Sequence, residues 1–151
     1  MKSTKKAFTM IELVFVIVVL GILASVAIPK FAATRTDAEI SKGVADISSI
    51  RSAIITERQS RLITGDSKYI KVGTGAKELD SGSLFGGVLT YGVKDSATSG
   101  HWTNTGGYAD ENTTTYNYQV GQTTVGFTYT RSTGIFDCTT QTDTYCSELT
   151  D

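Results

Sequence analysis

The sequence has few of the residues from which catalytic and metal sites are built. Its 151 residues include one histidine, one tryptophan, one proline and two cysteines. A zinc site needs more histidine and cysteine ligands than these, and no carboxylate pair is placed together by the sequence, so a catalytic triad or a metal-hydrolase signature is missing. His101 stands beside Trp102, where an ordinary loop pair is a better interpretation than a general base. We therefore expect a protein that is not an enzyme.

An excess of charge of either sign is also missing. Lysine and arginine number 14 against 15 aspartates and glutamates, which gives a formal net charge of −1. Such a balance argues against a binder of nucleic acid or another polyanion. Gly73-Thr74-Gly75 lacks the further glycines, or the Gly-Lys-Ser/Thr, that a nucleotide-binding loop needs. Neither class of ligand is expected.

What the sequence does contain is one long apolar run. About 17 residues from Leu13 to Pro29 carry no charge, which is near the length that spans a hydrocarbon layer of about 30 Å as a helix. The rest of the chain has room for one small domain. Lys2, Lys5 and Lys6 precede the run, and by the positive-inside tendency they stay cytoplasmic. Everything after Pro29 is then expected on the other side of the membrane.

The order of these features is the reverse of that in a secretory signal, because the small residue Ala7 comes before the apolar run. The basic leader, Ala7, Phe8 and the Thr-Met-Ile-Glu-Leu that follows resemble the class III leader of the type IV pilin family. In that family the small residue is usually glycine. The resemblance implies that residues 1–7 are a leader, that a prepilin peptidase cuts between Ala7 and Phe8 and methylates Phe8, and that residues 8–29 form a transmembrane and polymerisation segment.

Glu12 is the one carboxylate at the start of the apolar run. A carboxylate at the centre of a spanning helix costs about 2.5 to 3.5 kcal/mol, and one near an end partly escapes to the headgroups. It should therefore have a partner. The resemblance implies that Glu12 meets the cationic amino terminus of a neighbouring subunit, which sets the axial register of a filament. The alternative is a Glu12 that is solvated by headgroups.

Gly21 and Pro29 weaken the apolar helix. A glycine lowers helix stability by about 1 kcal/mol relative to alanine, and an internal proline by about 3 kcal/mol. In lipid the helix is expected to continue with a kink at Pro29, because backbone carbonyls freed by unwinding could not hydrogen-bond to water there. In a packed filament the stretch between Gly21 and Pro29 is expected to unwind, as it does in the pilins that the chain resembles. A proline kink without a function is the alternative.

Beyond Pro29 the apolar residues become one-sided. They are spaced four, three, three and four apart, which predicts an amphipathic helix over residues 30–64 with one face on a globular domain. Gly65-Asp66-Ser67 supplies the glycine and turn residues that end it. The apolar positions are Ile40, Val44, Ile47, Ile50 and Ile54.

The remaining residues, 65–151, are expected to form a globular head. A loop is predicted over residues 66–82, and the Thr-, Gly-, Tyr- and Val-rich sequence from Ser83 onward is typical of short twisted strands. Residues 95–112 are expected to be a surface loop anchored by Trp102. The expected fold is α+β, with a long helix packed on an antiparallel sheet of about four strands, as in the pilin fold. Strands are predicted at Leu84–Val93, Thr115–Val120, Val125–Thr130 and Gly134–Asp137, with hairpin turns at Gly121-Gln122 and Ser132-Thr133-Gly134.

Cys138 and Cys146 are the only cysteines. In an exported domain the default expectation is a disulfide that closes a C-terminal loop, with free thiols as the alternative. Such a bridge resembles the one that bounds the variable C-terminal loop of many pilins. The acidic residues around it give a weaker hypothesis of a Ca²⁺ site, as in the major pseudopilins of type II secretion, but their spacing matches no calcium loop. No cofactor is expected, and the acidic residues Asp137, Asp143, Glu148 and Asp151 are interpreted as a solvated tail.

Together these features predict a structural subunit of a type IV pilus-like filament. The resemblance implies a single-pass protein of the bacterial inner membrane with its C-terminus in the periplasm. It is surrounded by lipid until a platform protein and an assembly ATPase extract it. It then forms a helical homo-oligomeric filament, alone or with other pilins. A pseudopilin of a type II secretion system or of a DNA-uptake machine is the alternative. A membrane-tethered periplasmic binding protein that never polymerises is the hypothesis from a different class. Such a tether would require neither Glu12 nor the class III leader.

Overall fold

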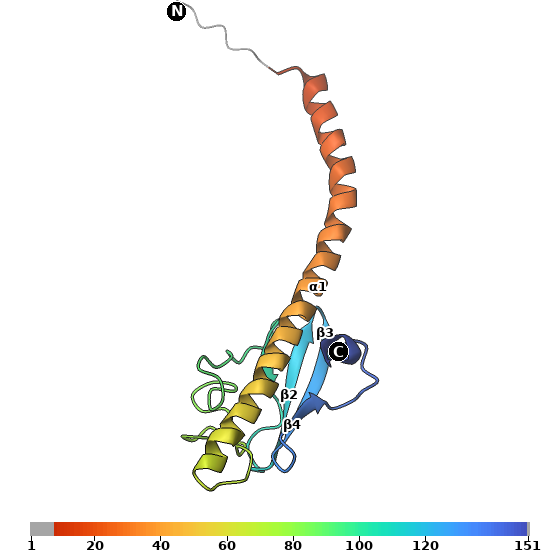
Figure 1. Ribbon diagram of the computed structural model, residues 1–151. Coiled ribbons are helices and arrows are strands. Elements are labelled where there is room, and N and C mark those ends of the chain that lie inside the picture. Colours follow the sequence, from red (N-terminus) through yellow and green to blue (C-terminus); the bar gives the residue numbers. More distant parts are fainter. Residues whose placement is uncertain (1–7, 151) are drawn as a thin grey trace, which may run out of the picture. The chain divides into compact units, whose positions relative to one another are not determined.

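The computed structural model describes residues 8–150 (Figure 1). The predicted leader 1–7, with Ala7, and Asp151 of the acidic tail lie outside the described residues. The chain divides into two compact units, Met1–Arg35 and Thr36–Asp151. The elements in chain order are α1 (Met10–Ile63), β1 (Trp102–Asn104), β2 (Thr113–Val120), β3 (Thr123–Thr130), β4 (Ile135–Cys138) and α2 (Cys146–Thr150). The α+β prediction is confirmed.

The long helix α1 has 54 residues and contains Pro29 in its interior. Its C-terminal end has the geometry of a Schellman motif. The Gly65 N–H donates to the Leu62 carbonyl (3.1 Å) and the Asp66 N–H to the Arg61 carbonyl (3.0 Å), while Gly65 has a φ of 88°. Only glycine adopts that conformation without strain, so the predicted stop at Gly65 is confirmed.

The sheet is an antiparallel meander with the order β1-β2-β3-β4. Its central hairpin pairs Val120 with Thr123 across the two-residue turn Gly121-Gln122, and Gly121 has the positive φ (57°) that a turn of this length requires. Alternate residues of β2 and β3 are buried, as the period of two in the sequence predicted. The predicted strands at 115–120 and 125–130 are therefore confirmed, each longer by two residues at its start.

The core of the head lies between the sheet and the second half of α1. Ile47, Ile50 and Ile54 are almost fully buried, and an aromatic cluster built around Trp102 faces them from the sheet side. Burial of each such side chain contributes about 1.5 to 3 kcal/mol. At Gly43 the helix approaches the sheet so closely that a Cβ would lie 2.6 Å from a carbon of the Tyr118 ring. The glycine is therefore required by packing.

The predicted strand at Leu84–Val93 is wrong. Leu84 and Val93 form a single antiparallel bridge, and the residues between them turn tightly. Phe85 has a φ of 59° and its N–H donates to Asp80 Oδ1 (2.7 Å), while a Cβ on Gly87 would collide with the Glu78 carbonyl. The first strand is instead β1, which lies inside the segment expected to be a surface loop and pairs Trp102 with Tyr118.

Polar side chains on α1 hold the loops of the head. Glu39 Oε2 accepts hydrogen bonds from the Ser99 hydroxyl (2.6 Å) and the Gly121 N–H (2.8 Å). Asp46 Oδ2 accepts from Trp102 Nε1 (3.1 Å), so the expected role of this tryptophan as an anchor is confirmed. Each of these carboxylates joins the helix to a segment more than 50 residues away in sequence. The helix therefore fixes the loops as well as the sheet.

Candidate processing and assembly site

The start of α1 is closed by a reciprocal pair of residues, Thr9 and Glu12. The Thr9 N–H and the Thr9 hydroxyl both donate to Glu12 Oε2 (2.8 Å each), and the Glu12 N–H donates back to Thr9 Oγ1 (3.3 Å). This is a capping box, in which the first and fourth residues satisfy backbone N–H groups that a helix start leaves free. From the sequence, Glu12 was predicted to pair with another subunit, and Thr9 was overlooked. The pattern Thr-x-x-Glu before an apolar run is typical of a capping box and could have predicted this contact.

The capping box uses only one of the two carboxylate oxygens of Glu12. Within residues 8–150, Glu12 Oε1 makes no hydrogen bond. Phe8 lies directly before the cap and is 87% exposed. The bond that is predicted to be cut, Ala7–Phe8, has one side outside the described residues. What the structure places together is therefore an exposed Phe8, a helix that starts two residues later, and a carboxylate with one oxygen left for a further donor.

The first part of α1 exposes its apolar side chains. The helix is long and apolar enough to cross a membrane, and no residue of its most apolar 18-residue window is buried. The core helix of a soluble protein would bury such a face. A Cβ added at Gly21 would meet no other side chain or distant backbone within 4 Å among the described residues, so packing inside the monomer does not require a glycine there.

Pro29 and Ser25 lie together in the weaker part of the helix. Pro29 has no N–H to offer the Ser25 carbonyl four residues earlier, and the Ser25 hydroxyl donates to the Ile22 carbonyl (2.7 Å). The helix nevertheless runs through this stretch without a break. The unwinding predicted between Gly21 and Pro29 concerns a packed filament and stays a prediction.

The two cysteines form the predicted disulfide. Cys138 at the end of β4 is bonded to Cys146 at the start of α2, with their Cα atoms 6.2 Å apart. The acidic residues around the bridge do not gather at one point. Asp137 pairs with Arg51 (Nη2–Oδ1 3.0 Å), and no three His, Cys, Asp or Glu side chains among residues 8–150 are placed to hold a metal ion. His101 Nδ1 lies within hydrogen-bonding distance of the Ser99 carbonyl in a surface loop (3.0 Å).

Asp80 is a buried carboxylate that was not predicted from the sequence. Asp80 is 3% exposed and accepts hydrogen bonds from the Phe85 N–H (2.7 Å), the Tyr116 hydroxyl (2.7 Å) and Asn104 Nδ2 (3.2 Å). Burial raises the pKa of Asp80 in spite of these donors, and burial together with the Asp80 charge raises the pKa of Tyr108 to about 12. The donors come from three separate segments, so Asp80 organises the head rather than a reaction.

Comparisons with known proteins agree with the geometry of the N-terminal part. Residues 2–28 match the family model described as the prokaryotic N-terminal methylation motif. The chain is pilin-like at its N-terminus. The motif ends just before Pro29, and the long helix with a four-stranded antiparallel sheet is consistent with the pilin fold. The resemblance inferred from the basic leader and the start of the apolar run, over roughly residues 5–31, is confirmed.

Two kinds of curated relatives match this pilin-like chain. The type IV major fimbrial protein FimA of Dichelobacter nodosus is 39% identical over 56 residues, which cover 37% of this chain and 36% of the relative. The type II secretion system core protein G of Pectobacterium carotovorum subsp. carotovorum is 40% identical over 50 residues, which cover 33% of this chain and 32% of the relative. The pilin-like chain thus spans about a third of the length of the curated relatives it matches. No solved structure matches it significantly.

Proposed function

We propose that this pilin-like chain is a structural subunit of a type IV pilus-like filament, cut between Ala7 and Phe8, methylated at Phe8 and polymerised through the first part of α1. The observation that carries the proposal is an apolar helical segment that is exposed throughout and bears one carboxylate at its start. Exposure on this scale marks a surface that a membrane or another protein chain covers. The methylation motif over residues 2–28 supports the same conclusion.

The proposed polymerisation rests on two physical terms. Each large apolar side chain of the segment gains about 1.5 to 3 kcal/mol when it leaves water, in lipid or among neighbouring helices. That term is not directional and sets no register. Glu12 supplies the direction, because a carboxylate that enters an apolar bundle needs a charged partner, and Oε1 is the acceptor that the capping box leaves for it. The partner in this proposal is the methylated, cationic amino terminus at Phe8 of the adjacent subunit.

In this proposal the protein is anchored in the bacterial inner membrane, with residues after Pro29 on the periplasmic side, before it enters the filament. A prepilin peptidase, a platform protein, an assembly ATPase and other pilins are its partners. The chemistry of the head gives no reason to propose an enzymatic activity. Its buried carboxylates within residues 8–150, Glu39 and Asp80, both accept hydrogen bonds from donors of the same chain.

A second candidate function is that of a pseudopilin in a type II secretion system. It is favoured by the 40% identity to a type II secretion core protein G over 50 residues. The matched stretch is of similar length and identity to that in the fimbrial relatives. Both functions share the same processing and the same polymerisation chemistry, so they differ in what the filament moves and not in how it forms.

The decisive experiment separates the charge of Glu12 from its role in the capping box. Glu12→Gln keeps an acceptor for Thr9 and removes the charge, whereas Thr9→Ala removes the box and keeps the charge. We expect Glu12→Gln to remain in the membrane fraction and to form no filaments that can be sheared from cells, and Thr9→Ala to assemble. Normal filaments from Glu12→Gln or Glu12→Leu would contradict the proposed pairing. Unchanged function of Glu12→Leu in cells where neither this variant nor the wild type forms filaments would favour a non-polymerising tether. Loss of extracellular secretion without loss of surface filaments would favour the secretion function.

A further inference from the structure

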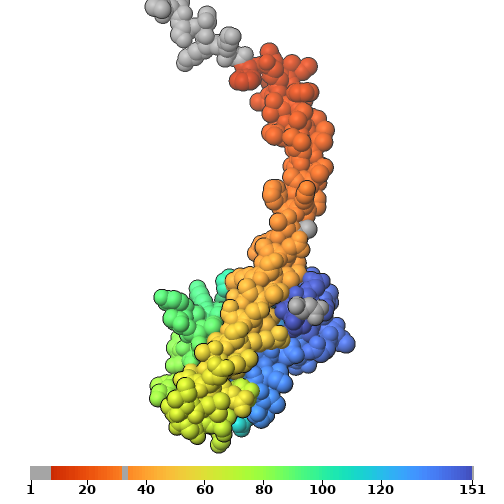
Figure 2. All heavy atoms as spheres, in the orientation of Figure 1, coloured from red at the N-terminus to blue at the C-terminus, as the bar shows by residue number. Residues whose placement is uncertain are grey.

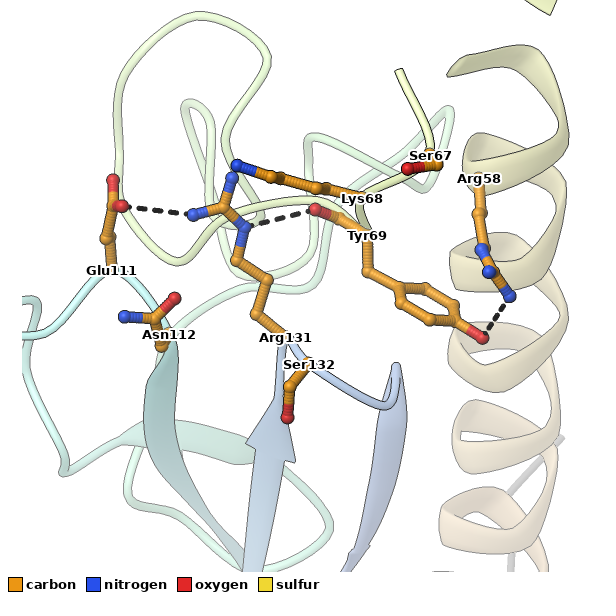
Figure 3. Close-up of a pocket in the computed structure, with 8 residues that line it drawn as sticks. All are labelled: Arg58, Ser67, Lys68, Tyr69, Glu111, Asn112, Arg131 and Ser132. Carbon is orange, nitrogen blue, oxygen red and sulfur yellow. Dashed lines mark hydrogen bonds and ion pairs between the residues drawn. The ribbon is translucent and has the colours of Figure 1, made fainter. Parts of the chain in front are cut away.

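The head carries a basic hollow whose cations come from three separate segments. Arg58 on α1, Lys68 in the following loop and Arg131 after β3 line a hollow of about 360 Å³ (Figure 3). The one carboxylate among the lining residues is Glu111. Three cations against one anion leave an excess of two positive charges. We refer to this hollow as the cationic cleft.

The two arginines of the cationic cleft are held in place by Tyr69. Arg58 stacks on the Tyr69 ring, with Cζ 4.2 Å from the centroid, and Nη1 donates to the Tyr69 hydroxyl (2.7 Å). Arg131 Nε donates to the Tyr69 carbonyl (3.2 Å) and Nη1 donates to Glu111 Oε1 (3.1 Å). Arg58 Nε is buried and has no partner among residues 8–150, and Lys68 makes no ion pair with any residue in that range. The cleft therefore presents two arginines held in position and a lysine without an ion pair among the described residues.

The opposite charge gathers around α2. Asp143 precedes this short helix and Glu148 lies in its first turn, where it is exposed. The segment is fixed to the head at two points, by the disulfide at Cys146 and by Leu149, which is buried. No side-chain hydrogen bond or ion pair within residues 8–150 uses the carboxylate of Asp143 or of Glu148. We refer to residues 143–148 as the acidic segment.

The cationic cleft and the acidic segment lie at opposite ends of the head. Leu149 packs against α1 at Gly43, whereas Arg58 is 15 residues further along the same helix, which corresponds to roughly 22 Å at 1.5 Å per residue. Figure 1 shows α2 near one end of the strands β2 and β3, and the turn after β3 at the other. In Figure 2 the C-terminal residues and residues 60–70 reach the surface at these two ends.

We propose that the cationic cleft of one head binds the acidic segment of a second copy of this chain. The inference rests on the proposed filament function and adds a contact between heads to it. A contact between two different, complementary patches is heterologous, and it propagates into an open helical polymer when the rotation between copies does not close into a ring. Complementary charge also fixes register and penalises wrong arrangements. Because both patches are open to solvent, the contact weakens as salt rises.

The test is a charge exchange in the full chain. Lys68→Glu and Glu148→Lys should each lower the yield of sheared filaments by about tenfold, since each places like charges together. The double variant should return to within about threefold of the wild type, because the attraction is restored with reversed sign. Lys94→Glu, an exposed reversal outside both patches, should leave the yield unchanged. Single variants with normal yield, or a double variant no better than the singles, would overturn the proposal.

A photo-crosslinking residue at position 68 gives a second measurement on an otherwise unchanged chain. An adduct that joins position 68 to a peptide containing residues 143–148 of another copy supports the contact. Adducts to other parts of the chain only, to lipid or to an unrelated protein overturn it and leave the filament function standing if filaments form. A wild-type chain that gives neither filaments nor adducts between copies contradicts the filament function itself, and the inference with it.

Discussion

Replacing Gly43 with alanine tests how closely α1 packs on the sheet. On an exposed helix this change stabilises by about 1 kcal/mol, because alanine is the better helix former. Here the new Cβ would lie 2.6 Å from Leu149 Cδ2 and 2.6 Å from Tyr118 Cε1, whereas carbon atoms pack at about 3.5 to 4.0 Å. One or both side chains must therefore move by roughly 1 Å.

Neither side chain can move freely. Tyr118 is fully buried, its hydroxyl donates to the Glu39 carbonyl (2.6 Å), and its ring lies 4.7 Å from that of Trp102. Overpacking of such a site costs about 1 to 3 kcal/mol. After subtraction of the helix gain, the net loss for Gly43→Ala is about 1 kcal/mol, or a melting temperature lower by about 4 °C for a head of this size. Gly43→Val should lose about 2 to 3 kcal/mol, because it adds two more carbons and gains less helix propensity.

The measurement is thermal unfolding of the full chain in detergent, followed by near-ultraviolet circular dichroism of the aromatic cluster. The matched control is the same substitution in a Leu149→Ala background, where one of the two colliding carbons is absent. The cost of Gly43→Ala should shrink there, and the difference between backgrounds measures the contact. A Gly43→Ala variant that melts several degrees higher than the wild type would refute the close packing of α1 on Tyr118.

Three further predictions concern the disulfide, the buried carboxylate and processing. Cys146→Ser should destabilise the head by about 2 to 3 kcal/mol and speed proteolysis from about residue 136 onward, with membrane insertion unchanged. Thiol labelling of the unreduced, denatured wild type is the direct check, and two readily labelled cysteines would argue against the disulfide. Burial raises the pKa of Asp80 above its ordinary 3.8. The contribution of Asp80 to the free energy of unfolding is therefore complete below pH 3.8 and is lost as pH rises through the raised pKa. The stability of the wild type relative to Asp80→Asn should fall between acidic and neutral pH, and a stability difference that does not change with pH would contradict the prediction. Mass spectrometry of the membrane protein should find a chain that begins at Phe8 with one added methyl group, and Ala7→Asp should retain the leader; an intact Met1 in the wild type would oppose the prediction.

The features that the sequence predicted correctly depend on local patterns. The alternation in β2 and β3, the glycine stop at Gly65 and the apolar period from Ile40 to Ile54 each reside within one segment. The N-terminal motif is also local, since residues 2–28 contain all of it. Such patterns can be recognised in the sequence because neighbouring residues alone determine which face of an element is apolar.

The features that were missed depend on distant partners. β1 has only three residues, and their pairing with β2 is set by tertiary contacts of Trp102. The glycine-rich stretch after Leu84 has the composition of a strand but forms turns, because Asp80 and Glu78 approach its backbone. The cationic cleft joins residues from three separate segments. The Thr9–Glu12 capping box is the exception, because its sequence pattern is local and could have been predicted.

The unequal lengths of the strands have a consequence for crowded heads. The two inner strands have eight residues each, whereas the outer strands β1 and β4 have three and four. An outer strand with unpaired backbone groups can recruit a strand from another molecule, and this is a route to aggregation. In a filament, heads are held at high local concentration for as long as the polymer exists. Outer strands this short offer few backbone groups to a neighbour, so heads can be brought side by side without fusing their sheets.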